Sequence, residues 1–157
     1  MNNYLVIVNK NSGSGNTEQI VINKVIPKLE SFDLSYNIIR PLNLYNLLSL
    51  LDDYKNNINF HAIIIVGGDG SIVPVLDFLK ENEMNDIPIA HIPAGSGNGL
   101  IKSILYSQNK TYSIESALNL IEEQNFKEID LLQVDLIEDE INLYSFLSIT
   151  WGILSDI

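Results

Sequence analysis

The chain has 157 residues, 46% of them hydrophobic, and contains no cysteine. This length suits one domain with a buried core, and the absence of cysteine excludes disulfide bonds and thiolate metal sites. A net charge of −11 with nine scattered Lys and Arg residues argues against nucleic-acid binding, which needs clustered basic side chains. The sequence has no apolar run of membrane-spanning length and no signal peptide pattern, so we expect a soluble, cytoplasmic chain.

The chain begins with a predicted strand, a glycine-rich loop and a helix. Residues 4–8 are an apolar run, and the loop KNSGSG follows the strand. Helical spacing then places four apolar side chains on one face, namely Ile20, Ile22, Val25 and Leu29. Asn16 or Thr17 is the expected N-cap of this helix.

Strands and helices continue to alternate along the chain. Residues 36–39 predict a second strand, and the next helix has a leucine face expected in the core, formed by Leu44, Leu47, Leu48 and Leu51. Two further strands are predicted at 62–66 and 89–92, and further helices near Ser71, over 100–106 and over 113–124. The alternation favours an α/β fold with an open, mainly parallel sheet flanked by helices.

The last part of the chain predicts a β hairpin. Its strands span residues 127–134 and 143–151 and are joined across the acidic turn EDE. The chain then ends with WGILSDI, directly after an apolar strand and without a polar tail. Because natural termini are usually exposed and poorly tied down, this end indicates a fragment of a longer protein.

Three strand ends carry glycine-rich turns, with the sequences NKNSGSGN, GGDGS and PAGSGN. The carboxyl ends of parallel strands meet at one edge of a sheet, so the turns are expected to form one crevice. Glycine lets the backbone approach a phosphate, and each turn leads into a helix N-terminus. One such turn is equally well explained as a tight connection, but three together predict a nucleotide or phosphate site. The spacing matches neither a Walker A loop nor G-x-G-x-x-G.

Asp69 is the residue that a glycine turn does not need, because a carboxylate at a helix N-terminus repels bound phosphate. Phosphoryl transfer offers it two uses, which are holding Mg²⁺ or accepting the proton of an attacking hydroxyl. Helix capping is the alternative explanation.

Other polar residues of the loops are candidates for hydrogen bonds to a nucleotide, with capping or turn closure as the competing explanation: Asn9, Ser14, Ser71, Ser96 and Asn98. His61 and His91 lie beside strands without metal-ligand neighbours, and a structural role is favoured for both.

GGDGS followed about two dozen residues later by PAGSGN resembles the catalytic domain of the diacylglycerol kinase and sphingosine kinase superfamily of lipid kinases. GGDG alone is shared with NAD kinases and phosphofructokinases, whereas PAGSGN is closer to sphingosine and ceramide kinases. VIVNKNSGSGNT resembles the first nucleotide loop of the family, and SITWGILSDI resembles a sphingosine kinase segment.

The resemblance implies that residues 1–157 are an N-terminal nucleotide-binding domain like that of phosphofructokinase and NAD kinase, truncated before a β-rich lipid-binding domain and poorly active alone. It implies an ATP- and Mg²⁺-dependent lipid kinase in which Asp69, as general base, activates the hydroxyl of a sphingoid base such as sphingosine. Asp156 matches the family aspartate that binds the amino-alcohol head, and no metal ligand is assigned. The implied ATP site comprises Asn9, Ser14, Gly67, Gly68, Gly70, Ser71, Gly95, Ser96, Gly97 and Asn98.

The sequence departs from the family pattern in the first loop. Asn11, Ser14 and Asn16 stand where the family usually carries Arg or Lys, so phosphate contacts would rely on backbone N–H groups and Mg²⁺. The alternative functions are a diacylglycerol kinase, another GGDG kinase such as an NAD kinase, and a non-catalytic nucleotide-binding module. A lipid substrate implies peripheral membrane contact of the full-length protein, and the oligomeric state is open.

Overall fold

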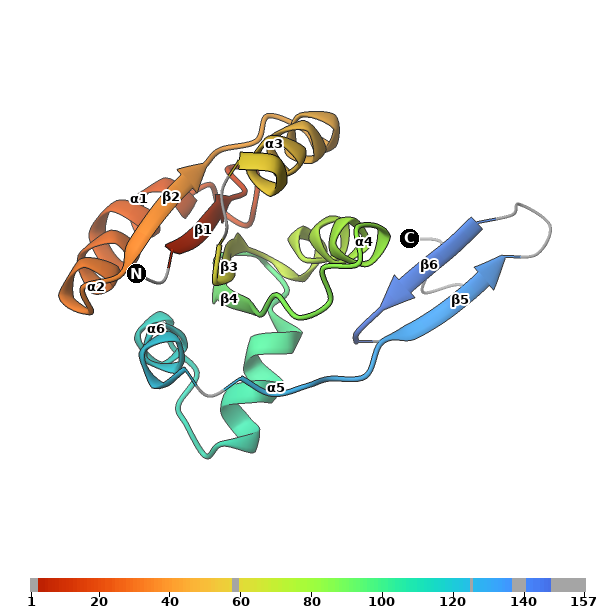
Figure 1. Ribbon diagram of the computed structural model, residues 1–157. Helices are drawn as coiled ribbons and strands as arrows, with labels where there is room; N and C mark the ends of the chain where they lie inside the picture. Colours follow the sequence, from red (N-terminus) through yellow and green to blue (C-terminus); the bar gives the residue numbers. More distant parts are fainter. Residues whose placement is uncertain (1–2, 58–59, 125, 137–140, 148–157) are drawn as a thin grey trace. The chain divides into compact units, whose positions relative to one another are not determined.

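A computed structural model describes residues 3–57, 60–124, 126–136 and 141–147. The chain divides into two compact units, Met1–Phe126 and Lys127–Ile157, which are described separately. The larger unit contains a parallel sheet with the strand order β2-β1-β3-β4 (Figure 1). Its strands are β1 (Asn3–Val8), β2 (Ser35–Ile39), β3 (Ala62–Gly67) and β4 (Ile89–Pro93). The predicted α/β fold with a mainly parallel sheet is therefore confirmed.

Helices cover both faces of the sheet. A helical segment runs through α1 (Thr17–Ile20), a π-helical turn η1 (Val21–Val25) and α2 (Ile26–Ser31), and lies on the opposite side of the sheet from α3 (Leu44–Asn57) and α4 (Val73–Glu81) (Figure 1). A 3₁₀ turn, η2 (Asp69–Ser71), precedes α4, and β4 is followed by α5 (Gly99–Ser107) and α6 (Ile114–Glu123).

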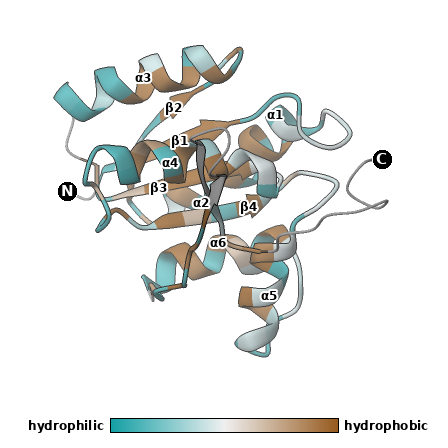
Figure 2. Cartoon of the chain, turned by 90° about the vertical axis from the view of Figure 1, so that its right-hand side faces the viewer, coloured by the Kyte–Doolittle hydropathy of each residue, from teal (hydrophilic) through white to brown (hydrophobic). Residues whose placement is uncertain are grey.

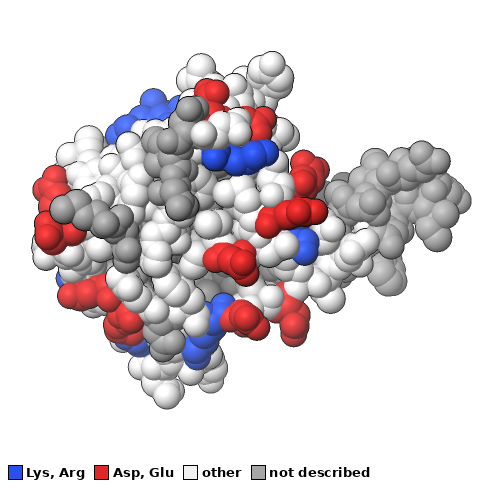
Figure 3. Space-filling view, in the orientation of Figure 1, with Lys and Arg blue, Asp and Glu red and all other residues white. Residues whose placement is uncertain are grey.

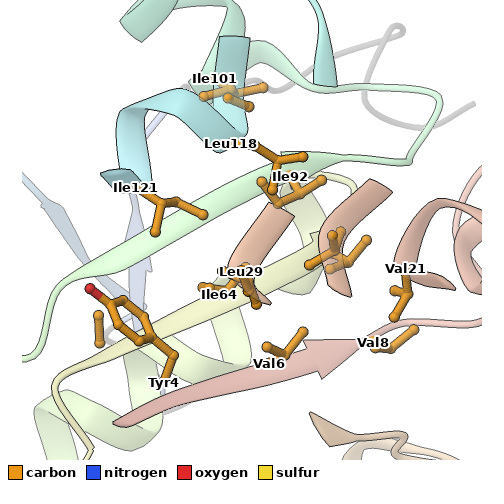
Figure 4. Packing of buried hydrophobic residues seen from close by; sticks show 14 of the residues in the cluster. Tyr4, Val6, Val8, Val21, Leu29, Ile64, Ile92, Ile101, Leu118 and Ile121 are labelled. Atoms are coloured by element: carbon orange, nitrogen blue, oxygen red, sulfur yellow. The ribbon is translucent and has the colours of Figure 1, made fainter. Parts of the chain in front are cut away.

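Burial on both faces explains why the strands are continuously apolar. Every residue of β3 is buried, and the sheet strands are mainly hydrophobic in Figure 2. Alternate side chains of β1, β3 and β4, such as Val6, Ile64 and Ile92, point into a cluster with side chains of the helices (Figure 4). The helical side of this cluster includes Val21, Leu29, Ile101, Leu118 and Ile121.

The core faces of two helices differ from the prediction. Val21, Val25 and Leu29 are fully buried at intervals of four residues, whereas Ile22 is 57% exposed. The π turn Val21–Val25 explains this phase, because its wider turn brings every fourth residue, rather than Ile22, back to the sheet.

In α3 only part of the leucine face is in the core. Leu47 and Leu51 are buried, whereas Leu44 and Leu48 are 57% and 36% exposed. The buried stripe of this helix is therefore one residue wide per turn.

The capping prediction for the first helix was also wrong in its mechanism. Asn16 is at the N-cap of α1, but its side chain makes no cap hydrogen bond, and the buried Thr17 hydroxyl has no partner.

The smaller unit contains an antiparallel hairpin of β5 (Leu132–Leu136) and β6 (Ile141–Ser145), with Val134 opposite Leu143. The hairpin itself is confirmed, but β5 begins later and β6 earlier than predicted. The predicted turn EDE and the end of the second predicted strand lie outside the described residues. Among the described residues, no helix combines the length and apolarity that crossing a membrane requires.

Candidate nucleotide-binding and catalytic site

The three glycine-rich loops lie side by side because their strands are in register. We call residues 9–16, 68–71 and 94–98 the first, second and third loops. Val8 is paired with Val66, and Gly67 with Pro93, so the strands end together. Backbone hydrogen bonds continue past the strand ends, from Asn9 N–H to Val66 O (3.0 Å) and from Ala94 N–H to Gly67 O (2.9 Å). The chain therefore assembles the loops at the carboxyl edge of the sheet, where open α/β sheets bind ligands.

Side chains tie the loops to one another. The Asn9 amide donates to the Ser71 hydroxyl at 2.8 Å, and the Ser12 hydroxyl accepts a hydrogen bond from Gly68 N–H at 3.3 Å. The Asn98 amide is committed to its own loop, since it accepts from Gly95 N–H and donates to Gly95 O. Asn9 and Asn98 therefore shape the loops, as the competing explanation by turn closure predicts.

Several glycines are required by loop-to-loop packing. A Cβ built on Gly95 would lie 2.3 Å from the Gly68 Cα, and one built on Gly13 would lie 2.5 Å from the Ala94 carbonyl oxygen. Gly13 also has a φ of +58°, which glycine tolerates best. By contrast, a Cβ on Gly70 meets nothing within 4 Å and one on Gly97 is only in ordinary contact with Asp69. Gly70 and Gly97 are therefore the glycines of the second and third loops left available to face a ligand.

Asp69 lies in the second loop but binds the start of the helix after the third. Its Oδ2 accepts a hydrogen bond from Gly99 N–H at 2.7 Å, and its Oδ1 accepts one from Leu100 N–H at 3.2 Å. Asp69 therefore caps α5, which is the alternative explanation in a form that the sequence did not indicate. The side chain remains 20% exposed, and a carboxylate with two such bonds keeps lone pairs for further partners. Capping thus fixes the orientation of the carboxylate without using all of its acceptor capacity.

His91 in β4 is buried beneath the second loop. Its Nε2 is 2.9 Å from Gly67 O, while its Nδ1 has no hydrogen-bond partner and lies 3.9 Å from the Asp69 Oδ1. Burial lowers the pKa of His91, and this outweighs the opposing effects of the Gly67 carbonyl and of Asp69. His61 is exposed and makes edge-on ring contacts with Tyr4 and Phe126.

The remaining predicted site residues divide into two groups. Ser14 and Ser96 are exposed in the first and third loops. Asp156 lies outside the described residues. The structure thus brings together every predicted ATP-site residue and Asp69, at the edge formed by the three loops.

Sequence reasoning missed two cations near the first loop. Arg40 directly follows β2, and its Nε donates to Glu18 in α1 at 2.9 Å. Lys10 in the first loop lies 3.9 Å from the same carboxylate. Elsewhere on the face of the larger unit seen in Figure 3, basic side chains are scattered among acidic ones. The sequence feature that could have revealed Arg40 is its position directly after a predicted strand, because that position lies at the carboxyl edge of the sheet.

Comparison with known protein families identifies the family of this chain. The diacylglycerol kinase catalytic domain matches residues 3–134. The chain belongs to this family of lipid kinases. The match runs from the start of β1 into β5, and so includes all three glycine loops and Asp69.

The diacylglycerol kinase family assignment agrees with individual relatives. Sphingosine kinase 1 of Caenorhabditis elegans is 30% identical over 99% of this chain and 35% of its own length. Sphingosine kinase 2 of Arabidopsis thaliana is 28% identical over 98% of this chain and 32% of its own length. The chain thus spans about a third of the length of these relatives.

A solved structure has the same fold. The crystal structure of a diacylglycerol kinase from Bacillus anthracis superposes with a TM-score of 0.62 at 22% identity, and the match covers 83% of this chain and 42% of that one. The superposition supports the sheet topology described above.

Proposed function

We propose that this chain is the nucleotide-binding part of an ATP-dependent kinase that phosphorylates the hydroxyl of a sphingoid base such as sphingosine. The observation that carries the proposal is Asp69, whose carboxylate is held by the N-terminus of α5 where three glycine loops meet. A positioned carboxylate beside a phosphate-binding edge is what phosphoryl transfer to an alcohol requires.

The loops supply the proposed ATP site. A Cβ on Gly70 would meet nothing within 4 Å and one on Gly97 would have only an ordinary contact, so both loops have room for a ligand. Backbone N–H groups there suit phosphate oxygens. Exposed Ser14 and Ser96 add hydroxyl donors, and Ser71 lies in the second loop as the last residue of η2. Lys10 and Arg40 add positive charge near the first loop, partly offset by Glu18.

Mg²⁺ fits this site as a companion of the nucleotide. The described residues contain no group of three or more His, Cys, Asp or Glu side chains that could hold a metal ion. Mg²⁺ in kinases is commonly held by one or two carboxylates and by substrate phosphates, and it supplies charge neutralisation there. The phosphates of ATP would therefore provide most of its ligands.

Asp69 is the proposed general base. As the lipid oxygen forms its bond to the γ-phosphorus, its proton passes to the Asp69 carboxylate, and the bond from phosphorus to the bridging oxygen of ADP breaks. The hydrogen bonds from Gly99 and Leu100 hold the carboxylate in place for this step.

The substrate class rests on similarity. The curated relatives named above are sphingosine kinases, and the third loop has the PAGSGN sequence. Asp156 is the proposed partner of the cationic head group. A diacylglycerol kinase is the second candidate, favoured by the family description and by the Bacillus anthracis structure. We further propose a β-rich lipid-binding domain in the full-length protein and peripheral membrane contact during catalysis.

The test is transfer of labelled γ-phosphate by the full-length protein with Mg²⁺, offering sphingosine, ceramide, diacylglycerol and NAD in parallel. Label in sphingosine is expected. Label only in diacylglycerol or NAD would refute the sphingoid substrate while keeping kinase activity. Bound ATP without transfer to any acceptor would favour a non-catalytic nucleotide-binding module.

A further inference from the structure

One buried titratable group near Asp69 has no part in the function proposed above. The His91 side chain is 1% exposed, and its ring lies between the end of β3 and the second loop. Its Nε2 contacts a carbonyl oxygen, that of Gly67, which can only accept a hydrogen bond. Nε2 therefore carries the hydrogen, and the neutral ring presents the lone pair of Nδ1.

That lone pair faces Asp69. Nδ1 is 3.9 Å from the Asp69 Oδ1 and has no other partner. An unpaired acceptor in a buried site is unfavourable, and next to a carboxylate it gains nothing. It would gain a donor as soon as Asp69 carries a proton. The two backbone N–H groups of α5 favour the ionised carboxylate, whereas Nδ1 is a neighbour that suits the protonated form.

We propose that His91 is a positioning residue for phosphoryl transfer, which receives a hydrogen bond from Asp69 at the moment that Asp69 takes the proton of the substrate hydroxyl. This inference rests on the proposed role of Asp69 as general base. The proton moves from the lipid oxygen to the carboxylate, and the new carboxyl O–H donates a hydrogen bond to the Nδ1 lone pair. The His91 ring stays neutral throughout.

The geometry indicates that Asp69, and not the His91 ring, moves to form this hydrogen bond. The carbonyl of Gly67 accepts hydrogen bonds from both His91 and Ala94 N–H, so the ring is anchored to the sheet. An O–H donor bonds at about 2.7–2.8 Å, so Asp69 must approach Nδ1 by about 1 Å. This approach would lengthen the 3.2 Å hydrogen bond that Oδ1 accepts from Leu100 N–H, whereas the shorter bond from Gly99 N–H to Oδ2 would still hold the carboxylate.

Protonation of the ring would cancel this function. A hydrogen on Nδ1 would donate to the ionised carboxylate and compete for the lone pairs that receive the substrate proton. Burial lowers the pKa of His91, which keeps the ring neutral at physiological pH. Within the described part of the chain, Asp69 is the charged group that faces the ring, at 3.9 Å from Nδ1.

Two substitutions of His91 distinguish the roles of its two ring nitrogens. His91→Gln places an amide N–H where Nε2 donates to Gly67 and removes the acceptor facing Asp69. His91→Asn places its amide at the Nδ1 position and loses the bond to Gly67. In the full-length protein we expect His91→Gln to keep the melting temperature and the KM for ATP but to lower kcat about tenfold, the effect of one buried hydrogen bond. His91→Asn is expected to have the lower melting temperature and the higher kcat of the two.

The outcomes distinguish this inference from the function on which it rests. Activity that falls in step with melting temperature across both variants would overturn the role of Nδ1. If His91→Gln has the kcat of the wild type while Asp69→Asn is inactive, the role of Nδ1 is also overturned, but the proposed function of Asp69 is kept. A wild-type rate for Asp69→Asn would overturn both. In the pH profile of kcat, the acid-side loss caused by protonation of His91 should be present in the wild type and absent from His91→Gln.

Discussion

Replacing Gly95 by alanine should separate the second and third loops. The added Cβ would lie 2.3 Å from the Gly68 Cα, 2.8 Å from the Gly68 nitrogen and 3.1 Å from the Gly97 carbonyl oxygen. Carbon atoms that are not bonded pack at about 3.5–4.0 Å, so the loops must part by more than about 1 Å. All close atoms are backbone, and no side chain can rotate to relieve the overlap.

The expected cost of this overpacking is about 1–3 kcal/mol of unfolding free energy. For a chain of this size, each kcal/mol lowers the melting temperature by about 2–4 °C. Since Asp69 follows Gly68 directly, the displacement should also disturb its 2.7 Å bond to Gly99 N–H. We therefore expect a melting temperature several degrees lower, together with a loss of kinase activity.

The assay is thermal unfolding followed by circular dichroism, with Gly70→Ala as the matched control. A Cβ on Gly70 meets nothing within 4 Å, and Gly70 is not among the residues with positive φ. Its melting temperature should stay within about 1 °C of the wild type. Equal melting temperatures for Gly95→Ala and Gly70→Ala would refute the close contact between the loops.

Three further predictions concern stability and binding. Stability should fall as the pH drops below 6.5, the ordinary pKa of histidine, because burial lowers the pKa of His91 and the unfolded state then binds a proton that the folded state does not. The urea midpoints at pH 7.5 and pH 5.5 should therefore differ less in His91→Gln than in the wild type. An equal difference in both proteins would contradict this prediction. Asn9→Ala and Ser71→Ala should each cost about 1 kcal/mol and be non-additive in a double-mutant cycle of urea unfolding, whereas additive effects would exclude their hydrogen bond. Gly97→Val should weaken ATP binding in calorimetry with little loss of stability, since a Cβ there has only an ordinary contact; unchanged affinity would remove the third loop from the site.

The order of strands and helices was predictable because each short apolar run is bounded by glycine, proline or polar residues. Convergence of the three loops followed from that order, since parallel strands end at the same edge. The core faces of the first and third helices were less predictable. The π turn at Val21–Val25 changes the phase that a regular helix would have, and no local feature marks it.

The site was predictable in its location and less so in its contacts. The sequence singled out Asp69, but its bonds to Gly99 and Leu100 span about thirty residues and depend on how the loops pack. For the same reason, loop packing rather than phosphate approach explains Gly95 and Gly13. The contact between His91 and Asp69 was also invisible, since it joins β4 to the turn after β3.

The most direct test of catalysis by Asp69 is a single-turnover measurement of γ-phosphate transfer to sphingosine by the full-length protein and its Asp69→Asn variant, with ATP affinity measured in parallel. Asparagine keeps the shape and one acceptor for the N-terminus of α5 but is a far poorer proton acceptor. We expect transfer to slow by about 100-fold or more while the Kd for ATP changes little. Transfer at the wild-type rate would contradict the assignment of Asp69 as the base and leave it as the cap of α5.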